Sequence, residues 1–443
     1  MNSLATAGFT PAVNSTYNNA AAPSLVSPFP TVFEYNQNRL ASTTNNLAPF
    51  DKGWATPAAL TSPLAVGQGY TVHLAGTQKV ALTGTLNTGD VAVPLARNAG
   101  ATAANAGWAL VGNPYPAPIN WASVLLTDRP GLDAAMYVFE SSGPYVGTYR
   151  TNVNNLGTSD LIGSSQGFFV RVASGNTSGT LIFRNAHRLT TYGTQVAVRR
   201  GTADLRPQVQ VRLAGAGHAD DLIVYSQAGA SADLDSEFDA TKLPNPTGLN
   251  VAAVAGTGQA LAIQGLPLLT TTTVVPLAVT VPGAGTYAFT APALLNVSAN
   301  TQVFLTDALT GQRRDLRTLP ATGYTFTLTA TQAATALTDR FALNLVPIGA
   351  ALATTNQTLA AGLGVYPNPT HGITTVTIPA LAGETTATLT LLDVLGRAVQ
   401  TQTLALTGAG ASVALPLAGL ATGVYILKVQ AGQAVVTKPL IIN

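Results

Sequence analysis

GVYPNPTHGITTVTI (364–378), TLTLLDVLGRAV (388–399) and LAGLATGVYILKVQAGQAVVTKPLIIN (417–443) occupy the carboxyl-terminal part of the chain. Short runs of alternating apolar residues are separated here by Gly, Pro and Asp, which favour turns. In a strand, successive side chains point to opposite faces, so a period of two indicates a strand that is buried on one face. The pattern predicts a small all-β sandwich over residues 364–443.

Composition extends the β prediction to the rest of the chain. The 443 residues are 47% hydrophobic but only 9% charged, against about 25% charged in an average soluble domain. With 42 Gly and 27 Pro, the chain can form many short strands joined by frequent turns. A surface built from Thr, Ser, Asn and Gln is typical of extended β-proteins outside the cell.

Charge and cysteine content exclude several classes of function. The net charge is +2, and basic residues cluster only in the pairs Arg199–Arg200 and Arg313–Arg314. Nucleic-acid binding requires a concentrated basic face, so it is disfavoured. The chain has no cysteine, which excludes disulfides, zinc fingers and thiol nucleophiles.

The amino-terminal sequence MNSLATAGFTPAVNST lacks the basic stretch and apolar core of a secretory signal peptide. No apolar run approaches the ~18 residues that a membrane-spanning helix needs. We therefore expect the chain to be a fragment of a longer secreted precursor.

Three motifs near the carboxyl end have specific local roles. Tyr366 and Asn368 each precede a proline, which favours an extended, edge-like entry that we expect Tyr366 to anchor. Asp393 and Gly396 fit a hairpin turn. After Gly423, the strand VYILKV should bury alternate residues beginning at Tyr425.

In this order, the motifs resemble the C-terminal sorting domain (Por secretion tail, type A) of type IX secretion cargo from Bacteroidetes-type bacteria. The resemblance implies an Ig-like fold, recognition at the outer-membrane translocon, and removal followed by release or attachment to surface polysaccharide. A generic Ig-like or fibronectin-like domain is the alternative. The residues that match the family motifs are Tyr366, Pro367, Asn368, Pro369, Gly372, Asp393, Gly396, Arg397, Gly423, Tyr425 and Lys438. Pro439 replaces a usual second Lys, so the last strand should be an edge or carry a bulge.

The chain upstream divides into two predicted modules. We expect a β-sandwich-like first module over residues 1–195, a second over residues 196–347, an exposed flexible linker over residues 348–363, and the Ig-like sorting domain over residues 364–443. The fold class is therefore all-β, with two tandem β-sandwich-like modules followed by a small Ig-like sandwich. In the second module, YTFTLT (324–329) alternates apolar residues with Thr, as a half-buried strand does.

The first module contains a candidate internal repeat. VFEY (32–35) is followed by GQGYTVHLAG (67–76), and VFES (138–141) is followed by SQGFFVRVAS (165–174). Each unit combines a VFE strand with a strand that begins at Gln-Gly-aromatic. Chance similarity between β-rich stretches is the alternative.

Three blocks upstream resemble recurrent blocks of a family of large secreted Bacteroidetes proteins: GWALVGNPYPAPINW (107–121), SSQGFFVRV (164–172) and SEFDATKLPN (236–245). The resemblance covers most of residues 32–346. It implies β-sandwich architecture and a surface location, but no chemistry.

Motifs for catalysis are weak. Residues 163–167, GSSQG, spell the G-x-S-x-G motif, but a strand follows where a hydrolase has a helix. Asp204 and His218 are the scattered residues that could complete a triad. His73, His187, His218 and His371 show no metal-binding spacing, and His73 fits a solvent-facing strand position.

Two patterns suggest ligands. Asp233, Asp235, Glu237 and Asp239 alternate, which is compatible with calcium or with the exposed face of an edge strand. Aromatic residues are concentrated in the first module, where they could stack on sugar rings or simply pack in the core. These aromatic residues are Trp54, Tyr70, Trp108, Tyr115, Trp121, Tyr145 and Tyr149.

From the sequence we expect a secreted or cell-surface, non-catalytic protein of adhesive or structural kind, exported by the type IX system and without a cofactor. The alternative is a glycan-binding accessory region of a larger secreted enzyme. Expected partners are the type IX translocon with its sorting and cleavage machinery, and surface polysaccharide or glycans. Nucleic acid is not an expected partner, and edge strands leave self-association open.

Overall fold

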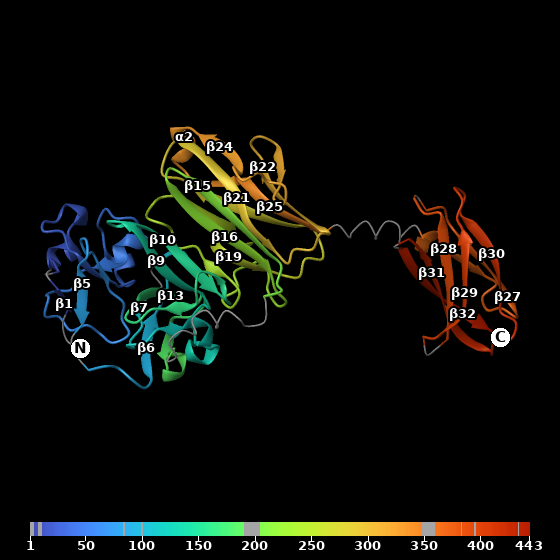
Figure 1. The fold of residues 1–443 in the computed structure, drawn as a ribbon, viewed down its shortest axis with the longest axis horizontal. Coiled ribbons are helices and arrows are strands. Elements are labelled where there is room, and N and C mark those ends of the chain that lie inside the picture. The colour runs from blue at the N-terminus through green and yellow to red at the C-terminus, as the bar shows by residue number, and fades with distance from the viewer. Residues whose placement is uncertain are drawn as a thin grey trace. The chain divides into compact units, whose positions relative to one another are not determined.

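Strands form nearly all of the regular structure, which confirms the all-β prediction (Figure 1). The computed structural model describes residues 4–7, 11–82, 85–98, 101–189, 204–347, 359–381, 383–393, 396–432 and 434–443. The chain divides into two compact units, Met1–Val346 and Pro347–Asn443. The predicted boundary at residue 195 and the linker residues 348–358 lie outside the described residues.

The first module consists of short strands and single helical turns. Its strands are β1 (Leu4–Ala7), β2 (Val32–Tyr35), β3 (Trp54–Ala55), β4 (Thr71–Val72), β5 (Lys79–Leu82), β6 (Val91–Ala96), β7 (Trp108–Gly112), β8 (Ile119–Asn120), β9 (Met136–Gly143), β10 (Val146–Val153), β11 (Leu156–Gly157), β12 (Leu161–Ile162), β13 (Gly167–Arg171) and β14 (Ser178–Phe183). Its helical turns are α1 (Arg39–Ser42) and 3-10 turns at Ser15–Asn19, Pro23–Leu25, Phe50–Gly53, Trp121–Ser123, Leu126–Asp128 and Asn185–His187.

Strand β7 lies between the two copies of the candidate repeat. The main sheet of the first module has the order β11-β10-β9-β13-β7. The VFE strand of each copy pairs antiparallel with the strand that follows its Gln-Gly pair, β2 with β4 and β9 with β13. On β7, Val111 pairs with Phe168 from one copy and forms a bridge with Gln68 from the other. The two similar stretches therefore have the same local pairing.

The second module is one large sheet folded over its own core. Its elements are β15 (Gln208–Gly215), β16 (His218–Ser226), β17 (Ala240–Thr241), β18 (Asn250–Val254), β19 (Ala260–Leu266), β20 (Thr273–Thr280), β21 (Gly285–Leu295), β22 (Thr301–Asp307), β23 (Gln312–Asp315), β24 (Tyr324–Leu328), α2 (Ala330–Ala333) and β25 (Leu337–Pro347). The strand order is β23-β22-β25-β20-β18-β19-β16-β15-β21-β24, with β17 paired to β19. In β24, Phe326 and Leu328 are buried while the threonines between are exposed, as predicted.

The two modules share a hydrophobic cluster. Trp108, Tyr137 and Phe169 of the first module are buried together with Ala240 and Leu243 of the second. All three blocks that resemble the secreted family contribute to this region, because residues 107–121, 164–172 and 236–245 supply four of these five side chains. Those blocks therefore hold the two modules together.

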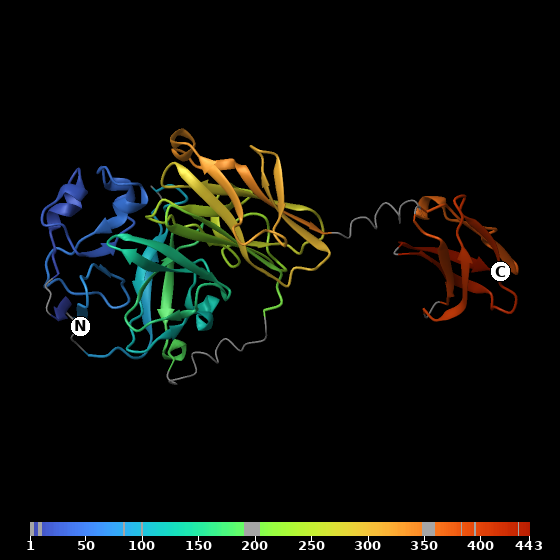
Figure 2. The same ribbon diagram turned by 45° about the horizontal axis from the view of Figure 1, so that its top comes forward.

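The second unit is a sandwich with a core of its own. Its strands are β26 (Gly364–Tyr366), β27 (Ile373–Ile378), β28 (Thr386–Leu392), β29 (Ala398–Ala405), β30 (Ala411–Pro416), β31 (Gly423–Ala431) and β32 (Ala434–Ile442). They form a three-stranded sheet, β26-β27-β30, and a four-stranded sheet, β29-β28-β31-β32, seen from two directions in Figures 1 and 2. Val376, Leu389, Leu427 and Val429 are buried between them.

The helices among the described residues are short, and none combines the length and the apolar character needed to cross a membrane.

Candidate functional site

The Y-P-N-P segment is attached to the last strand of the chain. The Asn368 side chain donates from Nδ2 to the Pro439 carbonyl at 2.7 Å and accepts from the Ile441 N–H at 2.9 Å. The Thr370 N–H donates to the Ile441 carbonyl, and the Asn443 N–H donates to the Thr370 carbonyl. Hydrogen bonds thus join the Y-P-N-P motif to the last strand of the chain. Residues 368–370 connect the first strand of the unit to the edge of the four-stranded sheet.

Tyr366 does not anchor this segment, which corrects the prediction. Its side chain is 57% exposed. Thr370 and Thr374 are buried instead, and the Thr374 hydroxyl donates to the Pro367 carbonyl at 2.9 Å. Polar threonines can lie inside here because their hydroxyls are bonded to backbone carbonyls.

The hairpin predicted around Asp393 and Gly396 is present, because β28 pairs antiparallel with β29. The Asp393 carboxylate accepts from the Arg397 backbone N–H at 3.0 Å and from Arg397 Nε at 2.8 Å. Gly396 has φ of +77°, a conformation that side-chain-bearing residues resist. The Arg397 side chain is 75% exposed, so it is accessible to a partner.

The last hairpin, β31 with β32, follows the predicted pattern. Gly423 begins β31, and Tyr425 lies in the core with its hydroxyl donating to the Ala421 carbonyl. Lys438 Nζ donates to the Leu363 carbonyl. Strand β32 is an edge of its sheet, which confirms the expectation based on Pro439. A proline is tolerated at an edge because no neighbouring strand needs its missing N–H. Gly372 and Pro369 lie in the connection between β26 and β27.

The described end of the predicted linker is only partly exposed. Leu359 and Leu363 are 0% and 2% exposed and belong to the core of the second unit, and residues 359–362 form a helical turn. The two leucines of LAAGL therefore pack on the sandwich, so the compact unit begins before residue 364.

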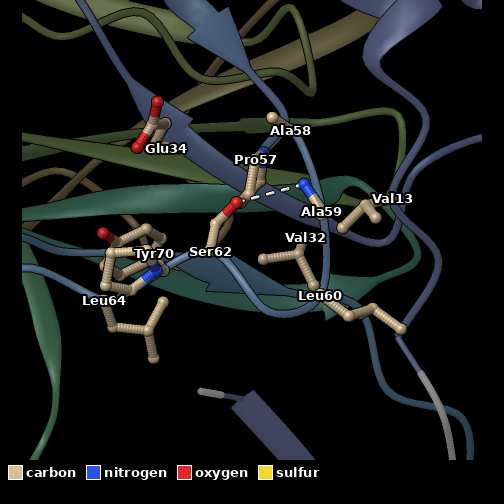
Figure 3. Close-up of a pocket in the computed structure, with 11 residues that line it drawn as sticks. Val13, Val32, Glu34, Pro57, Ala58, Ala59, Leu60, Ser62, Leu64 and Tyr70 are labelled. Carbon is tan, nitrogen blue, oxygen red and sulfur yellow. Dashed lines mark hydrogen bonds between the residues drawn. The ribbon is translucent and has the colours of Figure 1, made fainter. Parts of the chain in front are cut away.

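A pocket of about 190 Å³ opens on the first module, beside β2 (Figure 3). Most of its lining residues are apolar in type, and its polar side chains are Glu34, Ser62 and Tyr70. Glu34 accepts from Gln68 Nε2 at 2.9 Å, and Tyr70 accepts from the Ala65 N–H at 3.2 Å. Burial, opposed by the Ala65 hydrogen bond and assisted by the Glu34 charge, raises the pKa of Tyr70, so the phenol keeps its proton at neutral pH.

A second cavity, of about 170 Å³, lies where the two modules meet. Lys242 and Asp220 form an ion pair whose side chains are 5% and 2% exposed, and Asp220 also accepts from the Val251 N–H. Arg212 and Arg150 both approach Asp221. Every charge in this set has an opposite partner, which is typical of a structural ion-pair network.

The residues that could complete a triad have other places in the described structure: the Asp204 carboxylate accepts from Arg206 Nε and Gln208 Nε2, and His218 begins strand β16. The loop of residues 163–167 leads into strand β13, and Ser164 donates to the Tyr115 carbonyl. His187 is buried, where its Nδ1 accepts from the Arg184 N–H and its Nε2 faces Asp128 at 3.1 Å. His73 follows β4 and stacks on Tyr145 with ring centroids 5.0 Å apart.

The acidic run of residues 233–239 lies in bends and turns outside any strand, so the edge-strand alternative is wrong. Asp239 is 1% exposed and accepts from the N–H groups of Asp235 and Gly265, both at 2.7 Å. Glu237 forms a two-bond ion pair with Arg129. Asp239 therefore pairs with backbone N–H groups of its own module, and Glu237 pairs with an arginine of the first module. Within the described ranges, no three His, Asp or Glu side chains are grouped so that they could hold a metal ion.

Most of the seven aromatic residues singled out in the sequence pack inside the first module. Trp108, Tyr115, Trp121 and Tyr149 are buried. Their burial is expected, because large aromatic rings contribute strongly to the stability of a hydrophobic core. Tyr145 is 52% exposed, and Tyr70 and Trp54 are half-buried.

Sequence reasoning missed two features of these sites. The pairing of Asn368 with β32 joins residues more than seventy positions apart, which no local pattern indicates. The pocket beside Tyr70 depends on the loop of residues 57–65, whose Pro-rich sequence signals only a turn. The repeated Gln-Gly-aromatic motif is the sequence feature that could have indicated the pocket, since it contains Gln68 and Tyr70.

Comparison with known proteins gives two family matches. A model described as "Secretion system C-terminal sorting domain" matches residues 364–443. A model described as "Domain of unknown function (DUF8693)" matches residues 10–345. No curated protein matches the chain.

Two solved structures are weakly similar. Dimeric latent PorU from Porphyromonas gingivalis is 9% identical, with 70% of this chain and 29% of that chain covered and a TM-score of 0.16. The BSP domain of a biofilm associated protein is 9% identical, with 82% of this chain and 84% of that chain covered and a TM-score of 0.17. The chain thus spans less than a third of the length of PorU.

Proposed function

We propose that this chain, which belongs to the family "Domain of unknown function (DUF8693)" and carries a type IX sorting domain, acts as a non-catalytic adhesive or structural protein. Export by the type IX system, and hence a secreted or outer-surface location, follows from the sorting domain over residues 364–443. The same domain implies interaction with the type IX machinery. The adhesive or structural role and the absence of catalysis are the proposal.

The observation that carries the proposal is the combination of an export domain with a largely uncharged all-β body. Among the described residues, the polar clusters found at depth are paired internally, as in Lys242 with Asp220 and Arg129 with Glu237. Charges that are paired in this way contribute to structure. Extended β-sandwich modules with few charges are suited to presenting a surface outside the cell rather than to catalytic turnover of a substrate.

Self-association through strand edges belongs to the same proposal. Strand β24 is an edge of the large sheet and β29 is an edge of the four-stranded sheet in the second unit. Exposed edges offer unpaired N–H and C=O groups to another chain. An assembly formed in this way would serve a structural role at the surface.

Export is tested with the whole second unit. We expect deletion of residues 347–443 to retain the protein in the periplasm of a type IX-competent bacterium. Fusing those residues to a periplasmic reporter should send the reporter to the surface or medium. Immunoblots of periplasm, outer membrane and medium measure both. Unchanged export of the deletion variant would refute this function for the tail.

Adhesion is tested by removing the body and keeping the tail. Cells that display residues 347–443 on a reporter should attach to host matrix or to one another less than cells that display the full chain. Attachment counts measure the difference, and surface labelling confirms equal display. Equal attachment, or glycosidase or esterase activity of the purified full chain, would contradict the non-catalytic adhesive role.

A glycan-binding accessory region of a larger secreted enzyme remains the second proposal. The pocket beside Glu34 and Tyr70 favours a ligand-binding role of this kind. A catalytic domain encoded in the same precursor would support it over the independent adhesin.

A further inference from the structure

We propose that the pocket formed by Glu34, Ser62 and Tyr70 is a binding subsite for one pyranose unit of a neutral glycan. The inference rests on the proposed adhesive function, for which it supplies the class of ligand. It is carried by three polar side chains that line one concave space (Figure 3).

Glu34 provides the acceptor. Its Oε2 is held by Gln68 Nε2 at 2.9 Å, and Oε1 has no hydrogen-bond partner among the described residues. Gln68 is itself fixed, because its backbone forms a bridge with Val111 on β7. The carboxylate is therefore oriented in advance with one oxygen free to accept from ligand hydroxyls, and charged acceptors form the stronger hydrogen bonds.

Tyr70 and Ser62 provide donors. Each oxygen already accepts a backbone N–H, from Ala65 at 3.2 Å and from Ala59 at 3.1 Å. A hydroxyl has one proton to donate, and in both cases that proton has no hydrogen-bond acceptor among the described residues. The pocket thus presents one charged acceptor and two hydroxyl donors.

This set of groups fits a polyol better than an ion. A sugar hydroxyl both donates and accepts, so a pyranose can satisfy Glu34 and both hydroxyls at once. An ammonium or guanidinium group has no acceptor and would leave the two hydroxyl protons unpaired. An anion would meet the Glu34 charge, and no Lys, Arg or His lines the pocket.

The walls and the size also agree with one ring. Val32, Pro57, Leu60 and Leu64 give an apolar lining for the C–H face of a sugar. The volume of about 190 Å³ is below the ~300–1,000 Å³ range of drug-sized ligand sites. It suits a single terminal unit rather than a chain lying along a groove.

The second copy of the candidate repeat provides matched controls. Glu140 corresponds to Glu34, but it pairs with Arg150 at 2.6 Å. Phe168 corresponds to Tyr70, but it is 1% exposed and has no hydroxyl. Gln166 corresponds to Gln68 and accepts from the Gly163 N–H. The corresponding groups are therefore used for structure.

The test uses the full chain and defined probes. Methyl glycosides of glucose, galactose, mannose and N-acetylglucosamine are screened by saturation-transfer NMR, and any that bind are titrated. We expect Glu34→Gln to weaken binding by about tenfold or more, and Tyr70→Phe by about threefold to tenfold, as expected for hydrogen bonds to charged and neutral groups. Glu140→Gln and Tyr145→Phe should leave binding unchanged. Unfolding midpoints confirm that the variants are folded.

Three results would overturn the inference. One is that no methyl glycoside binds the wild-type chain, and another is that Glu34→Gln and Tyr70→Phe bind as wild type does. The third is that Nα-acetyl-arginine amide binds in a Glu34-dependent way while the glycosides do not. Loss of the subsite would leave cell attachment intact if another surface mediates it, so the two proposals fail separately.

Discussion

At the scale of the residue, one side-chain amide connects the beginning of the second unit to its end. Asn368 donates to one backbone group of β32 and accepts from another. Its amide therefore forms hydrogen bonds that a neighbouring strand would otherwise form at this edge. An asparagine suits this position because its side chain carries both a donor and an acceptor. The adjacent Tyr366, although part of the same motif, is largely exposed.

Asn368→Ala should destabilise the second unit by about 1–3 kcal/mol, because two backbone partners of β32 lose their hydrogen bonds. The expected signature is faster amide exchange of β32 and a lower unfolding midpoint of that unit. Tyr366→Ala is the matched control and should change neither quantity much. Equal effects of the two substitutions would contradict the role of Asn368.

Asp239 makes the stability of the first unit depend on pH. Burial, which outweighs the hydrogen bonds from Asp235 and Gly265, raises the pKa of Asp239 to about 7, against about 3.9 in an unfolded chain. The folded state therefore binds this proton more tightly. The stabilisation is complete below the unfolded value and is lost as the pH rises through about 7.

The first unit should accordingly be more stable at pH 5 than at pH 8, by on the order of 2 kcal/mol from this residue. Asp239→Asn should reduce that difference, and Asp233→Asn, at an exposed position, should not. Denaturant unfolding at both pH values measures it. Burial also raises the pKa of Asp133 to about 6, so a smaller slope of the same sign should remain. A variant that keeps the full slope would refute the assignment to Asp239.

At the scale of the element, strand β31 shows how a period of two becomes a buried face. Tyr425, Leu427 and Val429 point into the core, while Val424 and Ile426 are exposed. All five side chains are large and apolar, so composition alone does not distinguish the faces. The alternation does, because neighbouring residues of a strand point in opposite directions.

Leu427→Ala should destabilise the second unit by about 2–5 kcal/mol, the usual cost of a cavity in a packed core. Ile426→Ala, on the same strand but 42% exposed, should cost far less. Thermal unfolding of the full chain, with the second unit followed by limited proteolysis, compares the two. Similar losses would mean that the strand faces are assigned incorrectly.

At the scale of the whole molecule, two modules predicted as separate share a core. Ile263 and Tyr225 of the second module are buried in the same cluster as Trp108 and Phe169 of the first. Hydrogen bonds also cross between them, including the Asn245 side chain with the Tyr149 N–H at 2.8 Å. A common core of this kind couples the stability of both parts.

Ile263→Ala should therefore destabilise both modules together, by about 2–5 kcal/mol. Hydrogen exchange should quicken in β13 of the first module as well as in β16 and β19 of the second. Val274→Ala, at a site that is 55% exposed, is the control. Faster exchange confined to β16 and β19 would show that the modules unfold independently.

Sequence alone established the class of fold, the export domain and the local turns. Alternation identified the buried faces of β24 and β31, and Asp393 with Gly396 identified a turn, because strand faces and turns depend on residues close in the chain. The proline at position 439 even indicated an edge strand. The tertiary structure decided which distant segments meet: Asn368 with β32, Leu359 with the core of the second unit, residues 236–245 with the first module, and Glu34 with Tyr70 around a pocket. Such contacts follow from the packing of whole sheets against one another, and no local pattern of residues encodes them.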